Sequence, residues 1–187
     1  MTERINNARP RRLPIDISAD MLHRAQRGEV LALHELLQQL EPYVGRICGS
    51  IALDEGEDAA QETLLIIFKN LETLHEPKAL ASWARTIATR ESIRIARRIP
   101  LAIDQLDIAD VSDVHELDLR IDVRRTLERL SPEHRAVLVL SSFEDMAEAR
   151  IAEHLDVSPG TVKSRLSRAR NRFREEWRSW PTSRRPA

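Results

Sequence analysis

The stretch from Ser158 to Arg174, SPGTVKSRLSRARNRFR, can bury an apolar stripe only if it folds as a helix. Four apolar side chains follow one another at steps of four, three and four residues: Val162, Leu166, Ala169 and Phe173. At about 100° per residue these positions share one side of a helix, and that side must face a core. Ser158 suits the N-cap because its hydroxyl can accept from a free backbone N–H in the first turn.

The opposite side of this predicted helix is polar at its centre and cationic at both edges. The centre holds Ser164, Ser167, Arg168 and Asn171, and the edges hold Lys163 with Arg170 and Arg165 with Arg172. In the DNA major groove, central side chains reach base edges while flanking cations meet phosphates. Charge alone equally allows a solvated, salt-bridged helix. Such helices intersperse Glu with Arg at four-residue spacing, however, and no Glu precedes Glu175 here.

A second short helix is predicted just upstream, in the sequence ARIAEHLDVSPGTVKSRL. Its apolar residues are followed by a brief turn through Asp156 and Val157, and then by the basic helix. Ala152 is small enough to let two helices cross closely, and Val157 is apolar and can fill the corner between them. This is the spacing of a helix-turn-helix unit.

Composition favours helices along the whole chain of 187 residues. The sequence holds five Gly and 4% aromatic residues, and it is rich in Leu, Ala, Arg and Glu. Straight-chain residues lose little rotamer freedom in a helix. We therefore predict an all-α protein with two small helical domains joined by an acidic linker.

Charged residues, together with Gly and Pro, divide the chain into segments. The predicted segments are a mobile N-terminal arm at 1–18, a helical domain at 19–98, an acidic linker at 99–118, a helix-turn-helix domain at 119–178 and a C-terminal tail at 179–187. The formal net charge of −1 hides strong segregation. Residues 161–187 hold nine Lys or Arg and two acids, whereas residues 99–118 hold six acids and no Lys or Arg. Such segregation indicates different partners for different segments.

Single residues predict where helices begin and end. Gly28 and Pro42 punctuate the helical pattern that starts at Ala19, and Pro77 breaks the pattern before a further helix at 78–98. Asp54, with Glu57 three residues later, has the spacing of an N-cap and its N3 partner. Ser131, which precedes a proline, suits another N-cap.

Several classes of function lack support in the sequence. Cys48 has no second cysteine to pair with, which suits a reducing cytoplasm. An apolar run as long as any in the chain, Leu64 to Phe68, is far shorter than the roughly 20 residues of a membrane span. The N-terminus lacks the apolar core of a secretory signal. No metal-ligand spacing or phosphate-binding glycine loop is visible, so we expect no cofactor, no metal site, no catalytic residues and no membrane insertion.

The residues of both helical segments resemble one family. The sequence RLSPEHRAVLVLSSFEDMAEARIAEHLDVSPGTVKSRLSRARNRFRE is similar to region 4 of bacterial sigma-70 factors of the extracytoplasmic-function (ECF) class. DEGEDAAQETLLIIFKNL is similar to region 2.2 of that family, and SWARTIATRESIRIARR is similar to its regions 2.3 and 2.4. The resemblance covers residues 19–98 and 119–178.

This resemblance implies a sigma factor, which binds core RNA polymerase and directs it to promoters, and which is not an enzyme. The implied polymerase contacts are the β′ clamp helices and the β flap, and an anti-sigma factor is a possible further partner. The residues implied to contact the clamp helices are Asp58, Gln61 and Glu62. Those implied to bind the −10 element are Trp83, Arg85, Arg90, Arg94, Arg97 and Arg98, an aromatic with cations as single-stranded DNA requires. Those implied to bind the −35 element are Lys163, Ser164, Arg165, Ser167, Arg168, Arg170 and Asn171.

Three departures from the family pattern concern the −10 element. Leu80 stands where an aromatic is frequent, Arg90 stands where Asn is common, and the loop before Trp83 contains Pro77 and lacks the usual Gly. For Trp83, core packing beside Ile87 is an equally good interpretation. For the acidic residues of region 2.2, the alternative is an ordinary helix start favoured by the helix dipole.

Two other functions remain open at this point. A helix-turn-helix regulator of the LuxR type would need an N-terminal receiver or ligand domain, and residues 19–98 lack the alternating strands of an α/β receiver. A sigma-like decoy that only binds an anti-sigma factor would be expected to lose its base-facing cations. Lys163 and Arg168 are present, which counts against the decoy.

Overall fold

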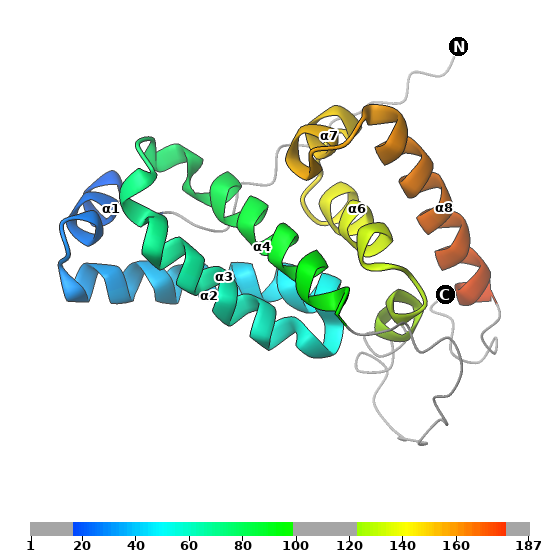
Figure 1. Cartoon of the computed structure of the whole chain (residues 1–187), viewed down its shortest axis with the longest axis horizontal. Coiled ribbons are helices and arrows are strands. Elements are labelled where there is room, and N and C mark those ends of the chain that lie inside the picture. The colour runs from blue at the N-terminus through cyan, green and yellow to red at the C-terminus, as the bar shows by residue number, and fades with distance from the viewer. Residues whose placement is uncertain (1–16, 99–122, 179–187) are drawn as a thin grey trace, which may run out of the picture.

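The structure, a computed structural model, describes residues 17–98 and 123–178. The predicted N-terminal arm, apart from residues 17 and 18, lies outside the described residues, and so do the acidic linker and the C-terminal tail. The described parts of the chain are built from helices and turns, with no strand among them (Figure 1). The predicted all-α class is therefore confirmed.

The chain's first two helices are separated by Gly28, as predicted. Helix α1 (Ala19–Gln26) begins where the Ser18 hydroxyl accepts a hydrogen bond from the Met21 N–H at 3.1 Å. Gly28 then adopts a φ of 84°, a conformation open to glycine at no steric cost. Helix α2 (Val30–Ala52) follows.

Pro42 does not interrupt α2, so the prediction that it punctuates the chain is wrong. Pro42 is exposed, whereas the next residues, Tyr43 and Val44, are buried. A carbonyl that loses its partner one turn before an exposed proline can bond to water. Burial of the following residues stabilises the helical path through this position and offsets the missing hydrogen bond.

Helix α3 (Gly56–Asn70) follows a 3₁₀ turn at Leu53–Glu55. The predicted Asp54 N-cap is wrong, because α3 begins two residues later without a side-chain cap and the Asp54 carboxylate pairs with Arg124. Gly56 lies against α2: a Cβ at this position would stand 2.7 Å from the Gly49 Cα. The missing side chain allows the two helix backbones to approach closely.

The third long helix of the first domain, α4 (Leu80–Ala96), begins after a 3₁₀ turn at Pro77–Ala79. The helical pattern is therefore interrupted at Pro77, as predicted. Helices α2, α3 and α4 pack on one another and α1 covers part of α2 (Figure 1). Their shared core is apolar, and its largest fully buried side chains include Leu36, Ile47 and Ile67.

The second domain contains α6 (Pro132–Ser142), α7 (Glu148–Leu155) and α8 (Pro159–Arg178). Residues 123–128 are also helical. Ser131 caps α6 as predicted, because its hydroxyl accepts from the His134 N–H. Seven buried residues form the core between the three helices: Val137, Leu140, Ile151, Ala152, Val162, Leu166 and Ala169.

The two domains are in contact with each other. Helix α6 packs against α2 and α4, and α7 also contacts α4 (Figure 1). Two α6 side chains, Ala136 and Val139, belong to the core of the first domain, while their neighbours Val137 and Leu140 belong to that of the second. Helix α6 is thus shared between the two cores.

Candidate nucleic-acid interface

The turn between α7 and α8 fixes the start of the basic helix. Helix α7 ends where Asp156 takes a left-handed conformation with φ of 54°, which is tolerated by Asp, and the Val157 N–H donates to the Ala152 carbonyl at 3.0 Å. The Ser158 hydroxyl then accepts from the Thr161 N–H at 3.1 Å. The predicted Ser158 cap is therefore confirmed, and the turn has the tight geometry expected of a helix-turn-helix unit.

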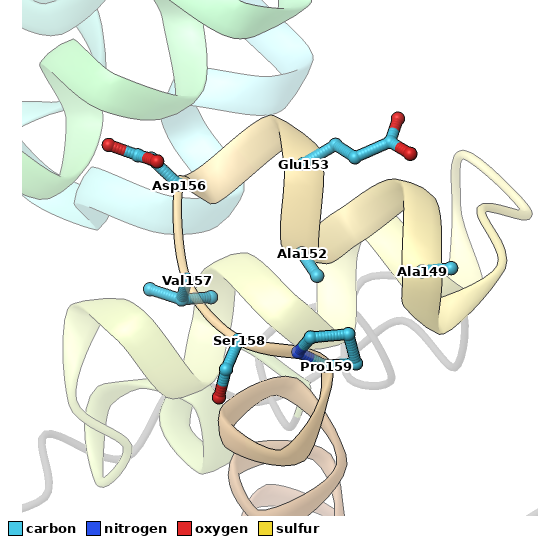
Figure 2. Close-up of a pocket in the computed structure, with 7 residues that line it drawn as sticks. All are labelled: Ala149, Ala152, Glu153, Asp156, Val157, Ser158 and Pro159. Carbon is cyan, nitrogen blue, oxygen red and sulfur yellow. The ribbon is translucent and has the colours of Figure 1, made fainter.

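A hollow lies against this turn, between the end of α7 and the start of α8 (Figure 2). Its lining residues come from α7, the turn and the first residue of α8: Ala149, Ala152, Glu153, Asp156, Val157, Ser158 and Pro159. Ala152 is small and buried, as predicted, and packs in the core between α7 and α8. The hollow therefore belongs to the helix-turn-helix unit itself.

The apolar stripe of α8 faces inward over its whole length. Val162, Leu166 and Ala169 are 0% exposed. Phe173 is half-buried and packs beside a separate cluster that contains Leu127 and Leu130. The predicted stripe is confirmed, and it determines which side of α8 faces solvent.

The outer side of α8 carries cations without internal counter-ions at its centre. Lys163, Ser167 and Arg168 are exposed, and neither Lys163 nor Arg168 forms an ion pair within the described parts of the chain. Ser164 and Arg165 are half-buried. A salt-bridged surface helix would neutralise such charges locally. The centre of α8 instead leaves its positive field available to an external anion.

Residues in the C-terminal half of α8 form contacts within the protein. Arg170 donates to the Ser141 hydroxyl at 3.1 Å, and Arg172 lies 3.5 Å from the Glu176 carboxylate. Asn171 accepts from Arg174 at 3.0 Å. Only the Arg170 contact reaches another helix, α6, whereas the contacts of Arg172 and Asn171 lie within α8.

Most of the predicted −10 residues share one side of α4 and its C-terminal end. On a helix of about 100° per residue, Trp83, Arg90 and Arg94 lie within a narrow sector, and Arg97 and Arg98 follow at the helix end. Trp83 is half-buried and packs on the core beside Ile87, so its ring serves the packing while part of it stays accessible.

The cations on this side of α4 differ in their partners. Arg90 and Arg98 are exposed and have no ion-pair partner among the described residues. Arg94 pairs with Glu91 at 2.5 Å, and the same partner raises the pKa of Arg94. Arg97 pairs with Glu133 of the second domain at 2.6 Å. Half of this cationic row is therefore already neutralised within the protein.

Arg85 does not lie with the other predicted −10 residues. It stands about 160° around α4 from Trp83 and faces the second domain. Its guanidinium pairs with the Glu144 carboxylate at 3.1 Å, and the two side chains are 13% and 5% exposed. Neither Glu144 nor this ion pair was predicted, because the two residues are 59 positions apart and belong to different periodic patterns.

The predicted polymerase-contacting residues lie together on α3. Asp58, Gln61 and Glu62 are all exposed. The expectation that the apolar run turns away from them is wrong in part, because Leu65 and Phe68 are each 49% exposed on the same side of the helix. The run of five apolar residues is wider than the side of α3 that meets the core, so only part of it is buried. The result is a mixed acidic and apolar surface of the kind found at protein interfaces.

The described residues hold neither a membrane-spanning helix nor a cluster of metal ligands. None of the described helices has the length and apolarity that a membrane span requires. Within the same residues, no group of three or more His, Cys, Asp or Glu side chains could hold a metal ion.

Comparisons with known proteins agree with this geometry. The family model Sigma-70 region 2 matches residues 33–99, and the model Sigma-70, region 4 matches residues 120–173. The ECF RNA polymerase sigma factor SigE of Mycolicibacterium smegmatis is 28% identical over 75% of this chain, which spans 60% of the length of that relative. SigL of Mycobacterium tuberculosis, another ECF RNA polymerase sigma factor, is 34% identical over 66% of this chain and 74% of its own length.

A solved structure shares the fold. It is that of the sigma factor RpoE in complex with the anti-sigma factor NepR from Bartonella quintana, with a TM-score of 0.56 and 22% identity over 80% of this chain and 98% of the other. The likeness to this structure concerns the arrangement of helices in both domains.

Proposed function

Because this chain belongs to the sigma-70 family and is a sigma factor of the ECF class, we propose that it binds core RNA polymerase in the cytoplasm and directs it to promoters. In this proposal residues 19–98 form region 2, residues 99–118 the linker and residues 119–178 region 4, flanked by an arm at 1–18 and a tail at 179–187. The protein performs no covalent chemistry itself. It supplies polymerase with DNA recognition.

One observation carries the proposal: the outer side of α8 presents the exposed Ser167 and Arg168 at its centre and the exposed Lys163 at one edge, and neither cation has an ion-pair partner among the described residues. This arrangement fits the major groove of the −35 element. There, Lys163, Ser164, Ser167 and Arg168 would meet base edges. Arg165 and Arg170 would mainly contact phosphates, and Asn171 would lie at the far end of the same surface.

Region 2 would recognise and open the −10 element. Trp83 offers a partly accessible ring for stacking or wedging, and Arg90 and Arg98 offer unpaired charges to the strand backbone. Arg94 and Arg97 would exchange their present carboxylate partners for phosphates. Arg85 is placed differently from these residues, and its contribution depends on a separation of the two domains.

Helix α3 would dock on polymerase. Asp58, Gln61 and Glu62 can bond to cationic side chains of the β′ clamp helices, while Leu65 and Phe68 supply apolar area next to them. The family resemblance further assigns region 4 to the β flap. The sigma factor RpoE from Bartonella quintana, which shares the fold, forms a complex with an anti-sigma factor, and we propose an anti-sigma factor as a partner here as well.

The other two functions are not favoured. The first domain matches sigma-70 region 2, so it is not the receiver that a LuxR-type regulator needs. A decoy would have lost its base-facing cations, yet Lys163 and Arg168 are exposed without ion pairs in the described residues.

Run-off transcription with purified core polymerase on a library of promoter fragments tests the proposal. We expect initiation at a defined subset of fragments and none without the protein. A double variant of the α8 surface, Lys163→Ala with Arg168→Ala, should lose this selectivity. Arg150→Ala, which removes an exposed cation of α7 that pairs with Glu153, serves as the matched control. Absence of initiation by the native protein at every fragment would contradict the proposal.

A further inference from the structure

The contact between the two domains is centred on one carboxylate. Glu144 lies in the turn after α6, and its side chain leaves its own domain to reach α2 and α4. One of its oxygens accepts from the Tyr43 hydroxyl at 2.9 Å and from Arg85 at 3.1 Å. Its side chain is 5% exposed. A carboxylate buried to this degree, and bonded only to the other domain by the side-chain contacts described, holds the two domains together.

A histidine of α7 extends the contact along α4. The two ring nitrogens of His154 lie 3.2 Å from the Thr86 hydroxyl and 3.4 Å from the Thr89 hydroxyl. Burial, together with the nearby cations Arg85, Arg90 and Arg150, lowers the pKa of His154 to about 4. The ring is therefore neutral at physiological pH, and it can accept from one threonine and donate to the other.

Further contacts lie at the other end of the interface. Arg97 pairs with Glu133, and Arg124 pairs with Asp54. Leu53 of the first domain packs with Leu127 and Leu130 of the second. These contacts are spread along α4 and the end of α2, so the domains are fixed in orientation as well as in position.

Two arginines in this region each have a buried N–H donor that forms no hydrogen bond with the described residues. The Nε atoms of Arg85 and Arg135 have no hydrogen-bond partner among the described residues. Arg135, on α6, is 5% exposed, and burial lowers its pKa to about 10. Buried donors without partners destabilise the packing around them. An interface that contains them can open at less cost than one in which every polar group is satisfied.

We propose that the free protein adopts a closed state in which Glu144 acts as a latch between the domains and withholds the Arg85 side of α4 from nucleic acid. The Glu144 carboxylate occupies the place that a DNA phosphate would take on Arg85. The closed state is thus self-inhibited without a second protein, and polymerase must separate the domains before the whole of α4 can meet DNA. The part of this proposal that concerns DNA rests on the proposed function.

Closure is tested first, with the full chain and without polymerase or DNA. Spin labels at Gln38→Cys on α2 and Glu175→Cys on α8, both exposed, report the separation of the domains in pulsed electron resonance. Burial raises the pKa of the Cys48 thiol, which leaves it unreactive to the labels. We expect one narrow distance distribution in the otherwise native protein.

Loss of the latch should broaden that distribution. In Glu144→Gln the charge of Arg85 stays buried without its counter-ion, and the ratio of open to closed molecules should rise on the order of a hundredfold or more. Asp145→Asn removes the same charge one residue away, at an exposed position with φ of 50° that Asn also tolerates, and should leave the distribution unchanged. Glu144→Arg should open the protein, and adding Arg85→Glu should close it again.

A native distribution as broad as that of Glu144→Gln would overturn the closed state, and so would an unchanged distribution in Glu144→Gln. Failure of the charge exchange to restore closure would overturn the latch. Circular dichroism of each variant should show native helix content, because the backbone of Glu144 bonds within its own domain, to the Val139 carbonyl.

Masking of α4 is tested next, by the affinity of the free protein for a mixed-sequence single-stranded oligonucleotide. Glu144→Gln should bind it more tightly than the native protein, with a salt slope larger by about one, whereas Asp145→Asn should not. Equal affinities in an open Glu144→Gln would overturn the masking of Arg85. Neither measurement involves transcription, so a failed run-off assay would leave the closed state standing and contradict only the promoter function.

Discussion

Helices α4 and α8 both carry several exposed or partly exposed cations, but they differ in how many of these cations form ion pairs within the protein. On α8, Lys163 and Arg168 project without ion pairs among the described residues, on the side away from the buried Val162, Leu166 and Ala169. On α4, three arginines are engaged: Arg85 with Glu144, Arg94 with Glu91, and Arg97 with Glu133. The proposed DNA-binding surface of α8 is therefore preformed, whereas that of α4 becomes complete only when carboxylates are displaced.

This difference fits the two kinds of DNA that the helices are proposed to meet. A duplex major groove presents base edges without distortion, so a rigid, ready surface is sufficient. A −10 strand must be unpaired first, and polymerase takes part in that step. In this proposal, the carboxylates paired with Arg85, Arg94 and Arg97 until then weaken the binding of α4 to other nucleic acids, while Arg90 and Arg98 stay available.

The largest expected effect comes from the buried stripe that aims α8. Leu166→Ala should destabilise the second domain by about 2 to 5 kcal/mol, because Leu166 is 0% exposed and a cavity would remain. Chemical denaturation checks the value. Ser167→Ala, at the adjacent exposed position, should change stability little while altering −35 recognition. A loss of stability in Ser167→Ala equal to that in Leu166→Ala would contradict the assigned orientation of α8.

The next largest expected effect is a pH dependence of the free energy of unfolding, caused by His154 at the contact between α7 and α4. The pKa of His154 is about 4 in the folded protein and near 6.5 when unfolded, so the unfolded state binds more protons between these values. Stability should therefore fall as pH decreases from 6.5 through 4, with separation of α7 from α4. Urea midpoints across this range check the trend, and His154→Gln should flatten it relative to the native protein. An identical pH dependence in both proteins would show that other groups are responsible.

Smaller effects should separate the centre of α8 from its edge. Arg168→Ala should lose about 1 to 3 kcal/mol of discrimination at one −35 position. Arg170→Ala should weaken all promoter sequences alike, because Arg170 lies at the edge of the surface, beside Ser141. Binding of both variants to a set of single-base −35 substitutions checks the distinction. Identical specificity profiles for the two variants would contradict the assignment.

The smallest expected difference lies within the α4 row. Arg90→Ala should reduce promoter opening, by less than about tenfold, because Arg90 is exposed and unpaired in the described structure. Arg94→Ala should reduce it less, because Arg94 must first leave Glu91. Opening rates from a fluorescent base in the −10 strand give the comparison. A larger effect of Arg94→Ala would show that the Glu91 pair does not compete with DNA.

The local features of the fold followed from sequence, and the contacts between domains did not. The α8 stripe and the Ser131 and Ser158 caps depend on spacings of a few residues, which a periodic pattern records. Asp54 has the spacing of a cap, but it pairs instead with Arg124, 70 residues away. Similarly, Glu144 and His154 look like ordinary surface residues until the packing of α6 and α7 on α4 gives them partners. Such long-range pairs leave no period in the sequence.

At Gly56 the start of α3 lies directly against α2, so a small displacement there changes the direction of the whole helix. A Cβ at Gly56 would stand 2.7 Å from the Gly49 Cα, so a side chain there must push the start of α3 away from α2. At 1.5 Å per residue, a tilt of 10° about this point would move the far end of the 15-residue helix by about 4 Å. Leu65 and Phe68 lie toward that end. The missing side chain at Gly56 thus fixes the direction in which α3 presents Leu65 and Phe68 to the proposed polymerase contact.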